Sequence, residues 1–336
     1  MDYFLAVIIP CWNCKPYIGE MLDCLLNQTF TDWKAFLVDD WCTDGTTEIV
    51  KEYAAKDARI QYFKRNREPK GAQTCRNIGF ELSEGAKYVV FFDADDLIAP
   101  YCFEQRVVFM EAHQELGMGV FPAKAFKQNI YDEENNVYGL PFISDDLEAF
   151  LNWNLPFTVW TNIYRRDAYN IHSLQWDEKV LSLQDSFFNI CALASGIKYA
   201  YSDNAKFDYF YRIGHVGVAK KIKTLEHYES HLYYLNRIAN IIENNYGNKY
   251  GFFVQNLFLL CLIQVFNCDK SMLNRMIDLS WVKTQYRFRV KLMLYSLFNM
   301  RGKSYLFKKH LTYSRSMASK WQDHMKVLAE GFRQNP

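Results

Sequence analysis

The sequence predicts an α/β fold, in which a doubly wound mixed sheet is followed by a C-terminal helical extension. Two observations lead to this prediction. Strand-like and helix-like segments alternate through residues 4–97, the pattern typical of α/β proteins. The strand-like segments are uninterrupted apolar runs such as 88–92, which is typical of strands buried on both faces of a sheet.

The first part of the chain shows the clearest alternation. In the segment 14–26, apolar residues such as Ile18, Met21 and Leu25 recur at helical spacing. The turn and capping residues 43–46 precede another helix. The expected strands cover residues 4–10, 33–38, 59–63 and 88–92, and a third helix covers residues 71–84.

The pattern is less regular after Pro100 and changes again near residue 220. Helices are expected at 103–113, 145–151 and 180–194, and strands at 120–125, 136–140, 159–164, 198–202 and 207–212. From Thr224 onward the apolar spacing is helical. The sequence therefore predicts an α/β domain over residues 1–220 and a helical region over residues 221–336.

Composition narrows the class of protein. The 336 residues include 39 basic and 38 acidic side chains, so the net charge of +1 gives no reason to expect a nucleic-acid partner. The nine cysteines are scattered, and Met1 leads into an apolar strand without the basic segment of a signal peptide. We therefore expect a reducing, cytoplasmic location. Polar residues interrupt the apolar run 251–268, which predicts a buried helix instead of a membrane span.

Carboxylates follow two of the expected strands. Asp93, Asp95 and Asp96 come after the fourth strand, and Asp39 and Asp40 come after the second. Because ligands of open α/β sheets bind at the carboxyl ends of the strands, we expect both groups at one edge. Clustered carboxylates repel one another unless a cation neutralises them, and hard oxygen ligands favour Mg²⁺ or Mn²⁺ together with phosphates. The alternative is a solvated acidic turn.

Further polar positions suit a chemical role, and each has a structural alternative. Arg76, near the start of the helix 71–84, suits an anion such as a diphosphate, or is a solvated side chain. Asp185, beside an aromatic helix face, suits a general base, or is a helix cap. Arg212 and His215 lie at and just after the end of an expected strand. As a basic pair they suit binding of a diphosphate, and the alternative is a structural role.

The C-x-x-C motif from Cys11 to Cys14 follows the first strand, a context that also suits a thioredoxin-like redox pair. The alternative is a strand-to-helix loop that contains two cysteines. The chain is much longer than a thioredoxin, and a redox role makes no use of the aspartate clusters. We therefore prefer the loop.

Together these motifs resemble the family 2 nucleotide-sugar glycosyltransferases of the GT-A fold, of the kind that builds bacterial polysaccharides and other glycans. The opening strand, helix and strand are similar in the segment VIIPCWNCKPYIGEMLDCLLNQTFTDWKAFLVDD. Cys75-Arg76-Asn77-Ile78-Gly79 and the D-x-D-D of Asp93–Asp96 follow at the family's usual distances. The later half is similar at Val159-Trp160, Arg165-Arg166-Asp167, Gln184-Asp185 and Tyr211-Arg212, so the resemblance covers residues 4–215.

The resemblance implies which residues bind the nucleotide. Pro10 and Cys11 would line the nucleotide pocket, and Asp40 would accept a hydrogen bond from the base, typically uracil. Arg76 would lie near the base or the diphosphate, and Arg212 would close over the pyrophosphate.

The resemblance also implies a metal and a catalytic base. Asp95 would hold Mg²⁺ or Mn²⁺ with Asp96 beside it, and Asp93 would contact the ribose or the sugar as well as the metal. His215 would join the metal ligands and close over the pyrophosphate, and Asp185 aligns with the catalytic Asp. A single base and in-line attack imply inversion at the anomeric carbon.

The sequence departs from the family pattern at two places. Trp41-Cys42 stands where the family usually has Gly-Ser, so the loop after the second strand must be bulkier. Gln184 stands where the family usually has Glu, which removes a charge beside Asp185.

The implied reaction moves a sugar, from a UDP-hexose or UDP-HexNAc, to a hydroxyl of a glycan or a lipid-linked glycan. One alternative is another nucleotide-binding α/β enzyme such as a nucleotide-sugar pyrophosphorylase. Such an enzyme normally needs a glycine-rich loop after the first strand, and residues 10–18 contain no glycine. Another alternative is a non-catalytic carbohydrate-binding protein. The oligomeric state stays open.

The segment 281–321 of the helical region is basic. It contains ten Lys and Arg residues, no acidic residue and many interleaved apolar side chains. Such a segment suits a peripheral contact with anionic lipids on the inner face of the cytoplasmic membrane. The alternative is a helical appendage with a solvated basic face, or a dimer contact.

Overall fold

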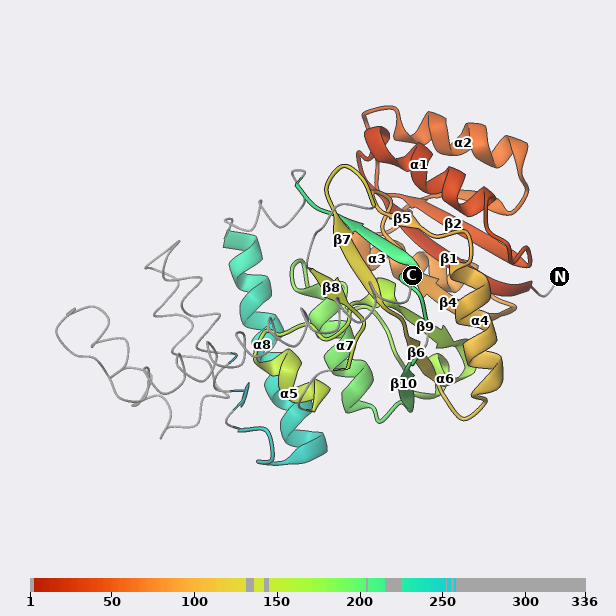
Figure 1. Ribbon diagram of the computed structural model, residues 1–336. Helices are drawn as coiled ribbons and strands as arrows, with labels where there is room; N and C mark the ends of the chain where they lie inside the picture. Colours follow the sequence, from red (N-terminus) through yellow and green to blue (C-terminus); the bar gives the residue numbers. More distant parts are fainter. Residues whose placement is uncertain are drawn as a thin grey trace. The chain divides into compact units, whose positions relative to one another are not determined.

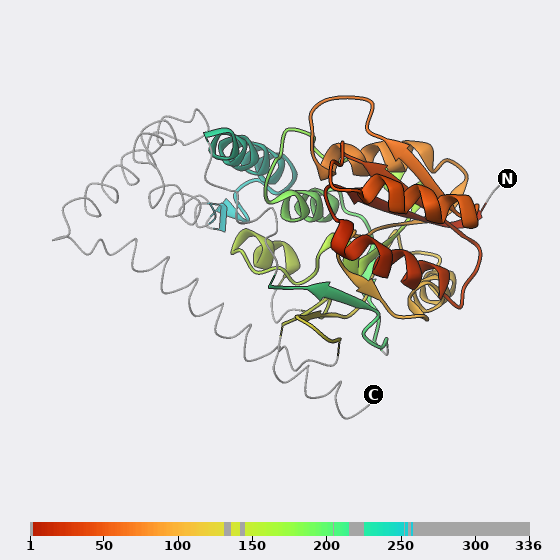
Figure 2. The same ribbon diagram turned by 90° about the horizontal axis from the view of Figure 1, so that it is seen from above.

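The computed structural model describes residues 3–130, 136–141, 145–203, 205–214, 225–251, 253–254 and 257 (Figures 1 and 2). These residues fall into two compact units. The larger unit comprises the described residues up to 141 and from 155 to 214, and the smaller unit comprises 145–154 and those from 225 onward.

The larger unit is built on a seven-stranded mixed sheet. Its strands are β1 (Tyr3–Cys11), β2 (Trp33–Asp39), β3 (Ile60–Lys64), β4 (Ala86–Phe91), β6 (Met118–Val120), β9 (Asn162–Arg165) and β10 (Tyr199–Tyr201), in the order β10-β6-β9-β4-β1-β2-β3. β1 pairs in parallel with β2 and β4, and β2 pairs in parallel with β3. β9 runs antiparallel between β4 and β6. This arrangement confirms the predicted mixed α/β sheet.

Helices pack against this sheet (Figures 1 and 2). They are α1 (Lys15–Leu26), α2 (Thr46–Lys56), α3 (Ala72–Leu82), α4 (Cys102–Ala112), α6 (Arg166–Ile171), α7 (Gln184–Ala194) and the 3-10 helix η1 (Val159–Thr161). The first four follow the predicted positions closely, because each carries apolar residues at helical spacing. The six-residue helix α6 was not expected.

Three predicted elements are corrected. The expected strand 120–125 is divided between β6 and another strand, because the chain leaves the first sheet at Pro122, which lacks an N–H. The expected strand 159–164 begins as η1, since Thr158 and Thr161 exchange hydrogen bonds that close a turn. The expected helix 180–194 begins only at α7, because Leu183 has a left-handed backbone with φ of 61°.

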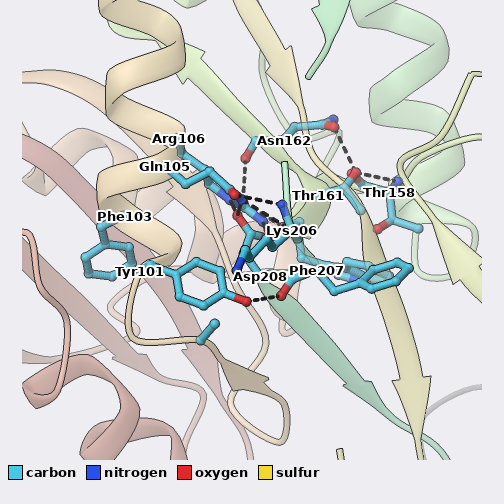
Figure 3. Close-up of polar contacts among 12 residues, drawn as sticks. Tyr101, Phe103, Gln105, Arg106, Thr158, Thr161, Asn162, Lys206, Phe207 and Asp208 are labelled. Atoms are coloured by element: carbon cyan, nitrogen blue, oxygen red, sulfur yellow. Dashed lines mark hydrogen bonds and ion pairs between the residues drawn. The ribbon is translucent and has the colours of Figure 1, made fainter. Parts of the chain in front are cut away.

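A second sheet of four strands was not predicted. It consists of β5 (Leu97–Ile98), β7 (Ala123–Phe126), β8 (Val137–Tyr138) and β11 (Tyr209–Arg212), in the order β5-β11-β7-β8. Figure 3 shows a buried ion pair beside β11, in which Arg106 of α4 contacts Asp208 through two hydrogen bonds of 2.8 and 2.7 Å. Arg106 also donates to the carbonyl of Trp160 in η1. This cluster joins α4, η1 and the start of β11.

Aromatic side chains fill the core between β4 and α7. The ring of Phe91 lies 5.5 Å from Trp176 and 6.1 Å from Phe188, and the last two rings stack at 4.4 Å. Tyr169, which lies in α6, stacks on Phe188 of α7. All four side chains are almost fully buried, so these aromatic residues are core.

The smaller unit contains α5 (Asp146–Leu151) and α8 (Leu225–Tyr246), which confirms the helix expected at 145–151 and the first of the helices expected after Thr224. Asp145 caps α5 and also accepts a hydrogen bond of 2.9 Å from Tyr250. No helix in the described part of the chain combines the length and apolar character needed to cross a bilayer. The segment 281–321, most of the run 251–268 and the predicted boundary at residue 220 lie outside the described residues.

Candidate active site

The carboxyl ends of β2 and β4 flank the end of β1. In the parallel register Pro10 pairs with Val38 and Cys11 pairs with Asp39, and the Asp40 N–H donates to the carbonyl of Cys11 over 2.8 Å. β4 lies on the other side of β1 in parallel. The two acid-tipped strands therefore end at one edge of the sheet, as predicted, about 10 Å apart given the usual strand spacing.

Asp39 and Asp40 have different surroundings. Asp39 accepts hydrogen bonds from Thr47 Oγ1 at 2.6 Å, Cys42 N at 2.7 Å and Tyr62 OH at 2.9 Å. Burial raises the pKa of Asp39, but these hydrogen bonds outweigh burial, and the pKa is lowered overall. Asp39 therefore holds the loop after β2.

Asp40 instead faces Arg65, the residue that follows β3. Arg65 Nε donates to Asp40 Oδ1 over 2.5 Å, and both side chains are buried. Burial raises the pKa of Asp40, and the hydrogen bond and charge of Arg65 oppose that shift without cancelling it. Sequence reasoning named Asp40 but not Arg65, although a basic residue directly after a third parallel strand was a usable signal.

The loop after β2 contains the predicted departure from the family pattern. Trp41 has a left-handed backbone with φ of 61°, a conformation that favours glycine, and its side chain is 54% exposed. Lys64 Nζ lies 3.5 Å from the centre of its ring. The bulkier loop thus places a tryptophan–lysine pair beside the carboxyl edge.

Arg76 of α3 links two predicted site residues. Its Nη2 donates to Asp93 Oδ1 over 2.6 Å, and its Nη1 lies 3.6 Å from Asp185 Oδ1. The guanidinium packs over the ring of Trp176, 4.3 Å from its centre. The structure therefore brings Arg76, Asp93 and Asp185 together, although they come from three separate elements of the chain.

Asp185 lies in the first turn of α7, and this helix begins directly after the left-handed residue Leu183. Its side chain is 32% exposed. Burial raises the pKa of Asp185, the charge of Arg76 opposes this rise and Asp93 adds to it, so that the pKa lies at about 6. A carboxyl group with this pKa is ionised at neutral pH and is a stronger base than an ordinary aspartate.

Polar side chains of α3 contact the first residue of α7 and the segment that precedes it. Gln184 Nε2 donates to Gln73 Oε1 over 2.7 Å, and Asn77 Nδ2 donates to the carbonyl of Trp176 over 2.9 Å. Gln184 also accepts from Arg76 at 3.4 Å. The residue that replaces the family's usual Glu therefore serves as a neutral contact between the two helices.

The three carboxylates after β4 differ in what they contact. Asp96 is buried and accepts from Tyr209 OH at 2.6 Å and from the backbone N–H of Arg212 at 2.7 Å. Burial, Asp95 and Asp93 raise the pKa of Asp96. Asp93 and Asp95 are both partly exposed. Asp96 is therefore engaged inside the protein, whereas Asp93 and Asp95 lie at the surface of the edge.

The fit of these carboxylates to a cation is partial. No group of three or more His, Cys, Asp or Glu side chains within the described residues is arranged to hold a metal ion. The hard oxygen donors nevertheless suit Mg²⁺ or Mn²⁺, and so does the repulsion from Asp95 and Asp93, which adds to the effect of burial in raising the pKa of Asp96. Such ions are commonly held by one or two carboxylates, with substrate phosphates and water as further ligands.

Arg212 is tied to the same loop. Its Nε donates to the carbonyl of Asp95 over 2.7 Å, its Nη2 pairs with Glu20, and its guanidinium lies over the ring of Phe126. The structure thus places Arg212 beside the acidic turn, as a brace for it. His215 lies outside the described residues.

The cysteines at this edge are free thiols. Cys11 is buried, and hydrogen bonding to Cys14 together with burial raises its pKa. Cys42 Sγ donates to the carbonyl of Cys11 over 3.3 Å. A raised pKa disfavours the reactive thiolate, so these contacts support the loop interpretation of the C-x-x-C motif.

Residues 6–172 match the model of the family described as Glycosyl transferase family 2. EpsJ of Bacillus subtilis, an uncharacterized glycosyltransferase, is 30% identical over 193 residues, which are 56% of this chain and 55% of EpsJ. The chain therefore spans about half the length of this relative.

TarS of Staphylococcus aureus, a poly(ribitol-phosphate) β-N-acetylglucosaminyltransferase, is 27% identical over 195 residues, or 56% of this chain and 32% of TarS. The crystal structure of TarS 1-349 with UDP-GlcNAc has a TM-score of 0.60 at 20% identity, covering 98% of this chain and 92% of that one. The mannosyltransferase PcManGT of Pyrobaculum calidifontis, with GDP-Man and Mn²⁺, has a TM-score of 0.51 at 17% identity, covering 98% and 88%. These likenesses confirm the predicted GT-A fold class.

Proposed function

The chain belongs to glycosyltransferase family 2 through its residues 6–172, and on this premise we propose that it transfers a sugar from a nucleotide-diphosphate donor to a hydroxyl group. The observation that carries the proposal is the group formed by Arg76, Asp93 and Asp185. In this group Asp185, whose pKa is raised, lies near Asp93 at the carboxyl edge of the sheet, where Asp185 would act as the base and Asp93 would contact the donor. Transfer of a glycosyl group needs the base that accepts the proton of the hydroxyl group to lie close to the residues that hold the donor.

We propose that the donor is a UDP-sugar, either a UDP-hexose or a UDP-HexNAc. TarS has been crystallised with UDP-GlcNAc, whereas PcManGT has been crystallised with GDP-Man. Asp40 would receive the hydrogen bond of the base, and Pro10 and Cys11 at the end of β1 would form the floor of the nucleotide pocket. Arg76 and Arg212 would lie on either side of the acidic turn, where two positive charges favour a diphosphate.

A divalent ion, Mg²⁺ or Mn²⁺, would neutralise the charge that develops on the departing diphosphate. Asp95 and Asp93 are the residues that would hold it, because their side chains are partly exposed at the edge. Asp96 would shape the turn that carries them, through its hydrogen bonds to Tyr209 and Arg212. His215 stays a predicted ligand.

Asp185 would accept the proton of the attacking hydroxyl. Its pKa of about 6 keeps it ionised at neutral pH, and Arg76 stabilises the ionised form. With a single base and no second carboxylate assigned as nucleophile, attack from the face opposite the leaving group would invert the anomeric carbon. An α-linked UDP-sugar would then give a β-linked product.

The acceptor would be a glycan or a lipid-linked glycan. TarS, by its description, acts on a poly(ribitol-phosphate) polymer. We propose residues 1–220 as the catalytic domain and 221–336 as a region for acceptor, membrane-surface or dimer contacts. The membrane contact of segment 281–321 remains a prediction from its basic composition.

The test is nucleotide release from a panel of UDP- and GDP-sugars with Mn²⁺, by the wild-type chain and by Asp185→Asn. We expect release from a UDP-sugar, and a loss of about 100-fold or more in turnover for Asp185→Asn with unchanged nucleotide affinity. The matched control is Asp167→Asn, an exposed Asp in the first turn of α6, which should turn over like the wild type. Wild-type turnover by Asp185→Asn would remove Asp185 from the mechanism.

A further inference from the structure

Arg65 is a buried cation beside the proposed nucleobase site, and no role for it follows from the reaction. It comes directly after β3, and its backbone N–H donates to the carbonyl of Asp39 over 2.9 Å. Its Nε donates to Asp40 Oδ1 over 2.5 Å. Only 6% of the Arg65 side chain and 5% of the Asp40 side chain are exposed, so the pair is shielded from water.

Other contacts hold the Arg65 guanidinium in one orientation. Its Nη1 donates to the carbonyl of Arg67 and to Glu68 Oε1, the latter at 3.0 Å. Since Glu68 is 79% exposed, its ion pair is screened by solvent, and Asp40 is the partner that Arg65 meets in the interior. The fixed fork of an arginine suits such directed contacts better than a lysine ammonium does.

Arg65 also opposes the effect of burial on Asp40. Burial favours the protonated form, whereas the hydrogen bond and the charge of Arg65 favour the carboxylate. Lys70 and the backbone N–H of Gly71 act in the same direction. Arg65 is the largest of these opposing influences.

The two forms of Asp40 would recognise different bases. An ionised carboxylate only accepts hydrogen bonds, whereas a protonated carboxyl group has an O–H that donates one. Uracil has an N–H at ring position 3, and cytosine has an acceptor nitrogen at the same position. At ring position 3 a carboxylate therefore favours uracil, and a neutral side chain with a donor tolerates cytosine.

We propose that Arg65 is a positioning residue that holds Asp40 as an oriented hydrogen-bond acceptor and thereby selects a nucleobase with a ring N–H, such as uracil, over cytosine. This inference rests on the proposed function, because it takes Asp40 to be the residue that meets the base. It adds a determinant of donor specificity at the residue that directly follows β3.

The test compares the affinities of UDP and CDP, measured by calorimetry with Mn²⁺, in the wild type and in Arg65→Gln, Arg65→Lys and Asp40→Asn. For the wild type we expect UDP to bind about tenfold or more tightly than CDP, as expected for a hydrogen bond to a charged group. In Arg65→Gln the ratio should fall towards one, mainly through weaker UDP binding. Arg65→Lys retains the charge and should recover part of the ratio.

Asp40→Asn tests the same idea by removing the carboxylate itself, so that Glu68 is the acid that still pairs with Arg65, and its amide N–H₂ can donate to cytosine. Its UDP/CDP ratio should also fall. The matched control is Arg59→Gln, which breaks another Arg–Asp pair, Arg59–Asp57, just before β3 begins. That variant should retain the wild-type ratio, even if its thermal stability decreases.

Two outcomes would contradict the inference in different ways. An unchanged UDP/CDP ratio in both Arg65→Gln and Asp40→Asn, with tight UDP binding, would show that the Arg65–Asp40 pair is only structural. Binding of neither UDP nor CDP by the wild type would instead overturn the proposed donor class, and this inference with it.

Discussion

Asp39 and Asp40 are neighbours in the chain, yet their side chains have opposite environments. Asp39 receives three hydrogen bonds from the loop and strand around it, and its pKa is lowered. Asp40 is buried against one arginine, and its pKa is raised. In an extended backbone, successive side chains point to opposite faces, so adjacent carboxylates at a strand end meet different partners.

The pKa of Asp185 predicts how turnover depends on pH. Below about pH 6 the carboxyl group is protonated and cannot accept a proton, so kcat/KM should rise with pH through about 6 and level off above it. Arg76 lowers this pKa, so Arg76→Gln should move the rising limb to higher pH. Arg76→Lys, which keeps the charge, should move it less.

The measurement is kcat/KM for nucleotide release between about pH 5 and pH 8 for the three proteins. Each variant also alters the contact with Asp93, so its KM for the donor is expected to change. The position of the limb on the pH axis is the readout that separates the two effects. A limb at the same pH in Arg76→Gln would contradict the proposed link between Arg76 and Asp185.

The assignment of Asp95 predicts a loss of metal dependence. In the wild type, EDTA should weaken UDP binding, and Mn²⁺ should restore it. In Asp95→Ala, UDP binding should be weak with or without Mn²⁺, because the ion would lose its carboxylate ligand. The control is Asp32→Ala, an exposed Asp before β2, at the opposite edge of the sheet. Full metal dependence in Asp95→Ala would refute the assignment.

At the scale of the element, α3 contributes Arg76 to the site and packs closely against β1. The close approach is at Gly79, where an added Cβ would overlap Ile8 Cγ2. Ile8 is fully buried in β1 and has no room to move. Gly79 therefore sets the distance between the helix and the sheet.

Gly79→Ala tests this close contact. Alanine favours a helix interior over glycine by about 1 kcal/mol, but overpacking a core costs about 1–3 kcal/mol. We expect the overpacking to dominate, so the free energy of unfolding should fall. In α1, an added Cβ at Gly19 meets nothing within 4 Å, so Gly19→Ala should instead raise it. The measurement is the free energy of unfolding of both variants in urea. If both substitutions raised it, the result would contradict the close packing at Gly79.

The turn before α7 is a second feature at this scale. Leu183 has a left-handed backbone, which is uncommon for a residue other than glycine. This conformation ends the preceding segment and starts the helix at Gln184, which leaves Asp185 in the first turn. Strained residues of this kind often occur at functional sites, because the surrounding packing holds them in place.

At the scale of the molecule, the buried pair of Arg106 and Asp208 joins distant parts of the larger unit (Figure 3). Both side chains are 0% exposed, and residue 208 immediately precedes β11, which carries Tyr209 and Arg212 to the acidic turn. The pair therefore fixes the strand that supports the proposed metal residues.

Asp208→Asn should destabilise the whole unit, because it leaves the Arg106 guanidinium buried without a counter-charge. Removing one partner of a buried ion pair costs about 3–5 kcal/mol, which should lower the Tm markedly. The control is Glu52→Gln in the pair Glu52–Lys56, whose side chains are 63% exposed and whose loss should leave the Tm unchanged. Equal Tm values for Asp208→Asn and Glu52→Gln would contradict the role of the Arg106–Asp208 pair in holding β11.

Much of the α/β core was predictable from local patterns. The positions of β1 to β4 and of α1 to α3 followed from apolar runs and helical spacing, which depend on neighbouring residues only. The second sheet was not predictable, because its strands are two to four residues long and pair with segments more than a hundred positions away in some cases. The break at Pro122 was visible in the sequence, but the sheet that β7 joins was not.

Local sequence was enough to establish that two acid-tipped strands end at one edge, because parallel pairing always brings carboxyl ends together. It named Asp40, Arg76, Asp93 and Asp185, but not how they pair. Only the tertiary structure decides these partners: Arg76 contacts Asp93 and Asp185, and Asp40 contacts Arg65, the residue that follows β3. Such contacts depend on how helices and strands pack, and no periodicity in the sequence records that packing.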